Sequence, residues 1–506
     1  MRWEYDGLLS DKYGNLTNVW QSLLLTQPIP PPGGTLVGYT VPSNFQGPIP
    51  QGVYQHNNNT YDPSGTAPVD NFAPRAGFAW QPFTNGKLVI RGGAGYFYDR
   101  PSGNYFINGI VYISVPKTAG EGGTGVGEAL GTFQDPWNPF NTFGWTPRKA
   151  DFTAGTSSNL GAGTFSETMP TPLVQEYNLN VQYEFPGRFL AEVGYVGSHG
   201  LHLQDKREIN QPSLASPDAP VNGLTTNTVQ NALLRAPYPG FATTSLISLL
   251  MVEDNADSRY NSLIASLKKS LTHGVQFGVA YTWSRSLTDL ASIGQLGGTL
   301  GSNNVNNVRQ MWGPSDIGRA QRIVVNYSWN APSYHSTDGF LGKFLNGWGV
   351  AGVTIAQSGF YITPTDSRGG TIYGNAGTAT GTPCPGITAS QLTTSGSLTS
   401  RLNKYFNSAA FCAPVAIGNG TGYGTLGRGD MNGPGQFNWD AAILKTTTVG
   451  GISENARLDF RAEFFNAFNH PQFANPVLPI GTASFGQITA ASVAPRLIQF
   501  ALKYSF

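Results

Sequence analysis

The C-terminal residues 495–506 alternate regularly between apolar side chains and polar or small ones. A period of two predicts a β-strand, because successive side chains of a strand point to opposite faces. A strand with lipid on one face and a wet lumen on the other requires this pattern, whereas a half-buried strand of a soluble β-sandwich is the alternative. The apolar face of this strand comprises Ile498, Phe500, Leu502, Tyr504 and Phe506.

The same alternation predicts strands elsewhere in the chain. In residues 174–185, aromatic and aliphatic side chains alternate with a polar set, and residues 457–468 alternate apolar side chains with charged ones. Burying a row of charges in a soluble core is costly unless each charge is paired, whereas the wet inner wall of a barrel accommodates such a row. The two polar rows are Glu176, Asn178, Asn180 and Gln182, and Arg457, Asp459, Arg461 and Glu463.

Each strand has one register choice, so these patterns predict the direction of every side chain. We expect both polar rows to face the lumen of a membrane barrel. An arginine on the lipid face costs about 2–4 kcal/mol at the membrane midplane, whereas an aromatic residue there carries no such penalty. The residues expected to face lipid are Trp439, Phe460, Phe464, Phe500, Leu502, Tyr504, Val279 and Tyr281.

The connections between predicted strands alternate in length. Short or moderate links are expected at residues 82–87, 186–187, 270–274, 329–346 and 447–455. Longer links are expected at residues 99–172, 197–258, 286–320, 358–435 and 469–494. Short turns at one end and long loops at the other are typical of outer-membrane barrels. The sequence therefore predicts an all-β, antiparallel transmembrane outer-membrane barrel, incomplete at about 12 strands, with long extracellular loops.

Composition agrees with this interpretation. Charged residues make up 12% of the chain, about half the share in soluble domains. A formal net charge of +1 predicts no nucleic-acid partner. The chain contains no run of about 18 apolar residues, so no transmembrane helix is expected. The chain opens on Met1 and Arg2 without a basic and then apolar leader, so we expect the true N-terminal part to be missing.

Few residues suggest site chemistry. Cys384 and Cys412 lie in one Gly, Thr and Ser-rich stretch, and we expect a disulfide because an oxidising compartment favours it. The glycines of residues 122–127 lack the Gly-Lys-Ser/Thr of a phosphate loop and are expected to form a plain loop. His199 and His202 are expected to be solvated on a loop. No nucleophile elbow, zinc motif or spaced carboxylate pair is found, so we expect neither an enzyme nor a cofactor or metal site.

Several short segments, in this order, resemble the C-terminal part of TonB-dependent transporters of the Oar-like type. They are residues 71–79 (NFAPRAGFA), 90–100 (IRGGAGYFYDR), 193–198 (VGYVGS), 281–284 (YTWS), 313–316 (GPSD) and 461–470 (RAEFFNAFNH). The resemblance implies a large barrel of about 22 strands, an internal plug, and energy from the TonB complex. It also implies that residues 1–506 are a barrel portion without the plug, the signal peptide and the carboxypeptidase-regulatory-like domain.

The first functional hypothesis is therefore TonB-dependent transport of a bulky nutrient, of the oligosaccharide or peptide class, in the outer membrane of a Gram-negative bacterium. The alternatives are a passive porin and a soluble β-rich adhesin or carbohydrate-binding module. The expected partners are outer-membrane lipid, the barrel-assembly machinery and, if the missing part is present, the TonB complex. The terminal strand, through Phe500, Tyr504 and Phe506, resembles the signal that directs such barrels to their assembly machinery.

Overall fold

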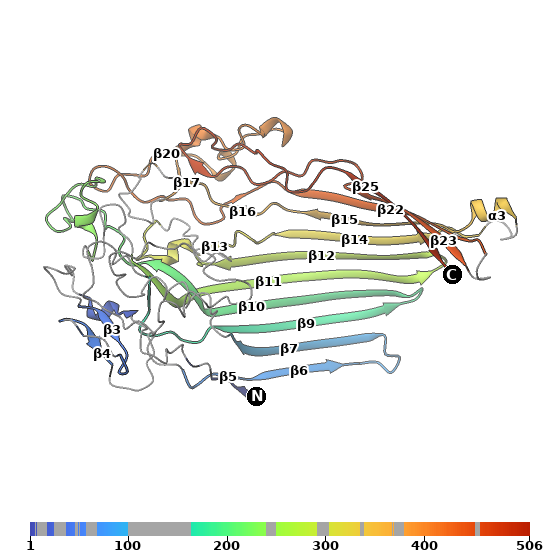
Figure 1. The fold of residues 1–506 in the computed structure, drawn as a ribbon, viewed down its shortest axis with the longest axis horizontal. Coiled ribbons are helices and arrows are strands. Elements are labelled where there is room, and N and C mark those ends of the chain that lie inside the picture. The colour runs from blue at the N-terminus through green and yellow to red at the C-terminus, as the bar shows by residue number, and fades with distance from the viewer. Residues whose placement is uncertain are drawn as a thin grey trace, which may run out of the picture.

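The computed structural model describes residues 1–5, 7, 18–24, 37–45, 49, 51–56, 68–99, 163–238, 249–290, 303–333, 339–366, 368, 379–450 and 456–506. Its main feature is one large antiparallel sheet, in which eleven long strands pair in sequence order (Figure 1). The strands are β6 (Arg75–Trp80), β7 (Leu88–Tyr98), β9 (Leu173–Phe185), β10 (Phe189–Glu208), β11 (Leu250–Thr272), β12 (Val275–Thr288), β14 (Gln321–Asn330), β15 (Trp348–Gln357), β22 (Gln436–Thr448), β23 (Arg457–Phe465) and β25 (Leu497–Ser505).

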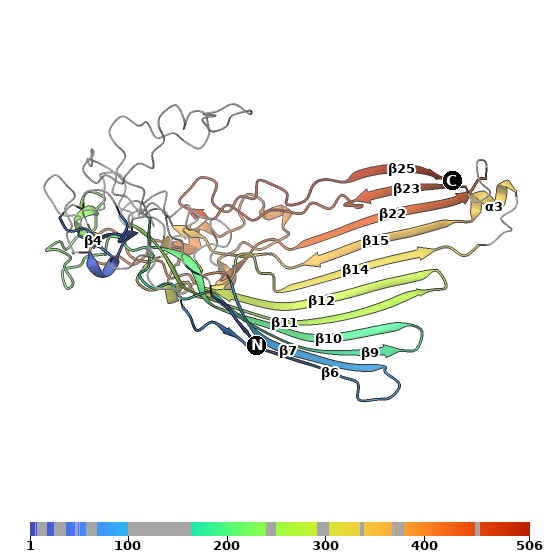
Figure 2. The same ribbon diagram turned by 60° about the horizontal axis from the view of Figure 1, so that its bottom comes forward.

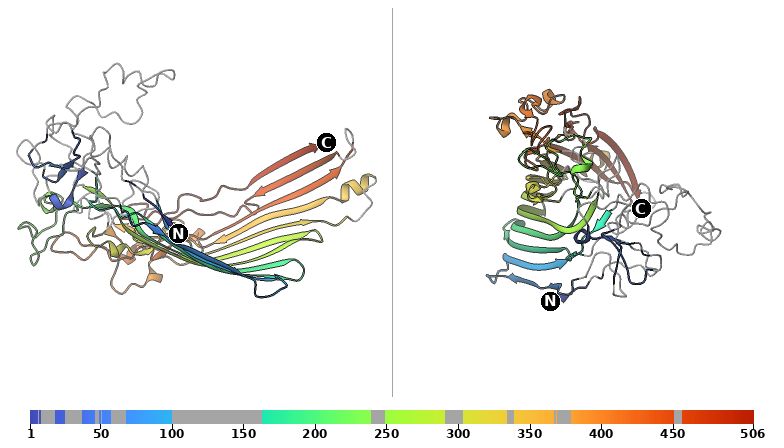
Figure 3. Two further views of the ribbon diagram at one scale, coloured as in Figure 1. Left: turned by 90° about the horizontal axis from the view of Figure 1, so that it is seen from below. Right: turned by 90° about the vertical axis from the view of Figure 1, so that its left-hand side faces the viewer.

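The sheet is curved and open. In a view along the strands it forms a trough, with β6 at one edge and β25 at the other (Figure 3). A strand pairing only with its neighbours in sequence is the up-and-down arrangement that membrane barrels use. The predicted fold class, an antiparallel outer-membrane sheet with long loops at one end, is thereby confirmed.

Short connections lie at one end of the sheet, together with the C-terminus (Figure 2). Arg188 follows Gly187 in the β9–β10 turn, with φ of 62° and 83° respectively, and His273 and Gly274 have φ of 51° and 76° in the β11–β12 turn. Two successive residues with positive φ match the twist of a tight antiparallel hairpin. The β14–β15 connection instead contains the only α-helix found among the described residues, α3 (Phe340–Leu345).

The opposite end carries the long connections and many short elements. Within them, the buried hydrophobic residues gather in clusters, which include one around Val19 and Leu249 and another around Phe406 and Phe411. The short strands are β1 (Arg2–Trp3), β2 (Asn18–Val19), β3 (Tyr39–Val41), β4 (Tyr54–Gln55), β5 (Phe72–Ala73), β8 (Gly163–Phe165), β13 (Gly313–Pro314), β16 (Tyr361–Ile362), β17 (Thr365–Asp366), β18 (Ala379–Thr380), β19 (Thr382–Pro383), β20 (Phe411–Cys412), β21 (Met431–Asn432) and β24 (Pro479–Ile480). The 3-10 helices are η1 (Gln21–Leu23), η2 (Leu233–Arg235), η4 (Val308–Met311), η6 (Ala389–Gln391), η7 (Thr399–Arg401) and η8 (Ser408–Ala410).

Three sequence predictions need correction or completion. The loop predicted for residues 197–258 is wrong at both ends, because β10 continues to Glu208 and β11 already begins at Leu250. The loop predicted for residues 358–435 is partly folded, with six short strands and part of a hydrophobic cluster. About 12 strands were predicted, whereas the large sheet has eleven along its main path, and the short β1 pairs with β5 in a separate two-stranded sheet.

Two further findings complete the fold. Across the helices of the described residues, none is long and apolar enough to cross a membrane. The glycine-rich residues 122–127, expected to form a plain loop, lie outside the described residues.

Candidate membrane wall and polar lining

The two polar rows predicted from the sequence share one face of the sheet. Glu176, Asn178, Asn180 and Gln182 point to the same side of β9. The residue-by-residue pairing across β10, β11, β12, β14, β15 and β22 leads from that side to the side of β23 that carries Arg457, Asp459, Arg461 and Glu463. Two rows separated by more than 270 residues therefore belong to one continuous surface, called here the polar face.

Contacts on the polar face are mostly local and solvated. Asn180 Nδ2 donates a hydrogen bond to Glu192 Oε1 at 2.6 Å. On β23, Arg461 lies 2.7 Å from Glu463, and the arginine side chain is 56% exposed. Exposed ion pairs contribute at most about 1 kcal/mol, so these charges are tolerated by hydration rather than required for packing. A wet surface is what a polar lining needs.

The opposite side of the sheet, called here the apolar face, carries all eight residues expected to contact lipid. Leu502 pairs with Phe460 and Phe500 with Ala462, and the pairing continues from Trp439 through β15 and β14 to Val279. Phe500 and Leu502 are 67% and 66% exposed. Exposed apolar surfaces of this extent mark contact with a membrane or another protein. The assignment of one face to lipid and the other to a lumen stays a prediction.

Three cross-strand pairs on the apolar face place an aromatic ring directly over a glycine. In each pair, a Cβ atom on the glycine would come within 3.0 Å of the facing ring atoms. Glycine is needed at these positions because only it leaves room for the ring. The pairs are Phe78 with Gly92, Tyr177 with Gly197, and Tyr327 with Gly352.

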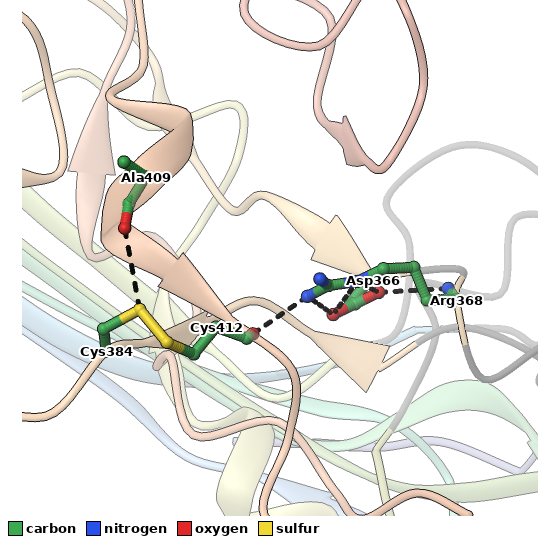
Figure 4. The surroundings of a disulfide bond; sticks show 5 residues. All are labelled: Asp366, Arg368, Cys384, Ala409 and Cys412. Carbon is green, nitrogen blue, oxygen red and sulfur yellow. Dashed lines mark hydrogen bonds and ion pairs between the residues drawn. A yellow bond between two sulfur atoms is a disulfide. The ribbon is translucent and has the colours of Figure 1, made fainter.

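A disulfide joins Cys384 and Cys412 at the loop end, with their Cα atoms 4.9 Å apart. The bond links the end of β19 to β20 (Figure 4). Arg368 donates to the Cys412 carbonyl at 2.9 Å and forms an ion pair at 2.6 Å with Asp366, which is buried. The disulfide therefore lies at one side of a folded loop region, whose cluster includes the stacked rings of Phe406 and Phe485.

A buried carboxyl group, which sequence reasoning missed, lies in the part of β11 that extends beyond the predicted membrane span. Asp254 is 3% exposed, and neither of its carboxylate oxygens has a hydrogen-bond partner. Burial, with a further contribution from the charge of Glu253, raises the pKa of Asp254 to about 7. Glu253 itself points to the other side of the strand and pairs with Arg207. No sequence signal marks Asp254 as buried.

The two histidines expected on a loop lie within β10 instead. His199 pairs in register with Arg259, whose Nε lies 3.5 Å from the histidine Nε2, and His202 has a φ of 55° at an irregularity of the strand. In the described part of the chain, no group of three or more histidine, cysteine or acidic side chains is arranged to hold a metal ion.

The fold and its two faces define the chain as a wall of an outer-membrane barrel. Residues 1–499 match the family described as outer membrane beta barrel domain, and the chain belongs to this family. Its location in the outer membrane, predicted from the sequence, is thereby confirmed. Comparison with curated protein sequences gives no match.

Among solved structures, the sheet is similar to large outer-membrane receptors at low identity. The transporter YddB from Escherichia coli has 10% identity and a TM-score of 0.43, covering 85% of this chain and 40% of its own. The ferric preacinetobactin receptor BauA from Acinetobacter baumannii has 12% identity and a TM-score of 0.36, covering 86% and 36%. The ferric-catecholate import receptor Fiu from E. coli has 10% identity and a TM-score of 0.35, covering 90% and 38%. The chain thus spans well under half the length of each.

Proposed function

We propose that this chain forms one wall of an outer-membrane transporter barrel for bulky nutrients, with the polar face towards the lumen and the apolar face towards lipid. The observation that carries the proposal is that the polar rows of β9 and β23 share one face of the sheet, while the other face carries the aromatic and aliphatic residues of β9, β12, β14, β22, β23 and β25. A soluble sandwich would instead cover its apolar face with a second sheet. The residues proposed to line the lumen are Glu176, Asn178, Asn180, Gln182, Arg457, Asp459, Arg461 and Glu463.

The free edges of the sheet support a larger assembly. Within the described residues, β25 pairs with β23 alone, and the outer edge of β6 is continued only by the short β1–β5 pair. Each backbone group left unpaired in hydrocarbon costs several kcal/mol, so a membrane sheet must close. We infer that further strands complete the barrel and that residues 1–506 are its C-terminal portion. A passive porin closed by this chain alone would need β25 to pair with the N-terminal strand.

The finer features of the proposal rest on the sequence. The Oar-like type, the dependence on the TonB complex and the oligosaccharide or peptide class of nutrient follow from the resemblance of the short segments alone. Recognition by the assembly machinery follows from Phe500, Tyr504 and Phe506. Phe500 and Tyr504 share the apolar face of β25, the terminal strand, and Tyr504 and Phe506 have ring centroids 5.8 Å apart. The long connections at one end would form the nutrient-binding surface.

Cysteine labelling of intact cells tests the orientation. Val415 is 80% exposed at the loop end, and Thr84 is exposed in the β6–β7 turn. A membrane-impermeant maleimide should modify a Val415→Cys variant in intact cells, but a Thr84→Cys variant only after the outer membrane is permeabilised. Equal labelling of both variants in intact cells would reject the proposed wall.

A further inference from the structure

Helix α3, at the turn end of the sheet, presents an exposed apolar surface. Phe340, Leu341 and Phe344 are 83%, 61% and 59% exposed, and the two phenyl rings stack with centroids 6.3 Å apart. The helix stands beyond the ends of β14 and β15 (Figure 1). Three large exposed apolar side chains on a helix of six residues mark a surface for contact with a membrane or a protein.

Two residues of the apolar face hold α3 in place. Trp348 Nε1 donates a hydrogen bond to the carbonyl of Phe344 at 2.9 Å. Lys445 Nζ donates to the carbonyl of Lys343 at 2.6 Å and also to that of Asn346. A cation bonded to the last carbonyls of a helix satisfies groups that the helix itself cannot.

The anchoring residues also show on which side of the wall the helix is attached. Trp348 and Lys445 are direct cross-strand partners, and the next pair on the same face is Val350 with Ile443. These residues belong to the apolar face that continues to Trp439 and Phe460. Lys445 Nζ also lies 5.5 Å from the centre of the Trp348 ring. Both contacts to α3 therefore come from the apolar face.

We propose that α3 is an interfacial membrane anchor, which inserts Phe340, Leu341 and Phe344 among the phospholipids of the periplasmic leaflet. This inference rests on the proposed function, because it requires the apolar face to meet lipid. The helix continues that face at the turn end, where barrels carry aromatic residues at the membrane boundary. Short helices with an apolar surface and a lysine at the water side lie in this plane of a membrane. Lys343 is exposed, and in this arrangement its ammonium group would contact the anionic head groups.

Fluorescence quenching in proteoliposomes tests this proposal with the full chain. The two cysteines of the sequence are bonded to each other, so one introduced cysteine is the single free thiol for a fluorescent label. The labelled positions are Phe344→Cys on α3, Leu502→Cys on the apolar face, and Asp218→Cys, which is exposed at the loop end. The quenchers are phospholipids brominated near the head-group end of their acyl chains, and aqueous iodide.

We expect brominated lipid to quench the labels at 344 and 502 to a similar degree, and iodide to quench the label at 218. Adding Phe340→Glu to the Phe344→Cys variant should reduce quenching by lipid and increase quenching by iodide. If the label at 502 is quenched by lipid and that at 344 only by iodide, the anchor is rejected while the proposed wall stands. If lipid quenches neither label, the proposed wall itself is rejected.

Discussion

Replacing Phe460 with arginine tests the two faces at one position of β23. Its ring lies on the apolar face, paired with Leu502 and stacked on Phe500 with centroids 6.3 Å apart. The strand runs from Arg457 to Phe465, so Phe460 lies one residue before its centre. We expect Phe460→Arg to impair assembly into membranes, whereas Arg461→Gln, on the neighbouring residue of the polar face, should leave assembly intact.

The magnitude follows from the position in the wall. An arginine on the lipid face costs about 2–4 kcal/mol at the midplane and less towards the boundary, so about 2 kcal/mol is expected here. Loss of the stacked aromatic pair adds about 1 kcal/mol. Arg461→Gln removes a 2.7 Å pair with Glu463 whose arginine is largely exposed, and should change the free energy by no more than about 1 kcal/mol.

Urea titration of the full chain folded into phospholipid vesicles measures both effects as shifts of the unfolding midpoint. Phe460→Arg should lower the free energy of unfolding by about 3 kcal/mol in total, relative to the unchanged chain. A loss for Arg461→Gln as large as that for Phe460→Arg would refute the assignment of the faces. The row from Arg457 to Glu463 would then belong to a protein-covered surface of a soluble fold.

Three further outcomes are expected. Replacing Cys384 and Cys412 together by alanine should destabilise the folded loop region by about 3–4 kcal/mol, because the disulfide closes a loop of sequence separation 28. Limited proteolysis should then cleave this region faster, while the long strands of the sheet stay protected. The pKa of Asp254 is raised by burial, so its contribution to stability is complete below pH 4 and is lost as the pH rises towards 7. The protection factors of the amides in the extended part of β11, which correct for the pH dependence of intrinsic hydrogen exchange, should therefore be lower at pH 8 than at pH 5, and an Asp254→Asn variant should abolish this difference in protection. Gly352→Val should destabilise the sheet by about 1–3 kcal/mol through its clash with the Tyr327 ring, measured by the same urea titration, and a Tyr327→Ala change in the same chain should relieve part of that loss.

The alternation of side chains was sufficient to predict the membrane part of the sheet. In β23 and β25 every charged residue lies on one side, and every apolar residue except Phe465, Leu497 and Ala501 lies on the other, so the period predicts the register. The disulfide partners were also predictable, because the chain contains two cysteines and both lie in one stretch.

The loop end was less predictable for physical reasons. At the loop end both faces of β10 and β11 meet water or other loops, so polar residues such as Lys206 and Arg207 follow one another without alternation. In the region around Cys384 and Cys412 the strands are only two residues long, too short for any period to show. The buried state of Asp254 depends on segments distant in sequence, and α3 is too short to show a helical period.

The three rings that lie over glycines help to set the register of neighbouring strands, which the alternation of side chains alone does not fully determine. A strand that slips by one residue turns its apolar side chains towards water, but a slip by two restores every face. The ring–glycine pairs oppose the two-residue slip, because after such a slip Tyr177 would face Tyr195 or His199 in place of Gly197. Likewise Tyr327 would meet Val350 or Thr354 in place of Gly352. Each ring and its glycine thus favour the observed alignment of two neighbouring strands over an alignment shifted by two residues.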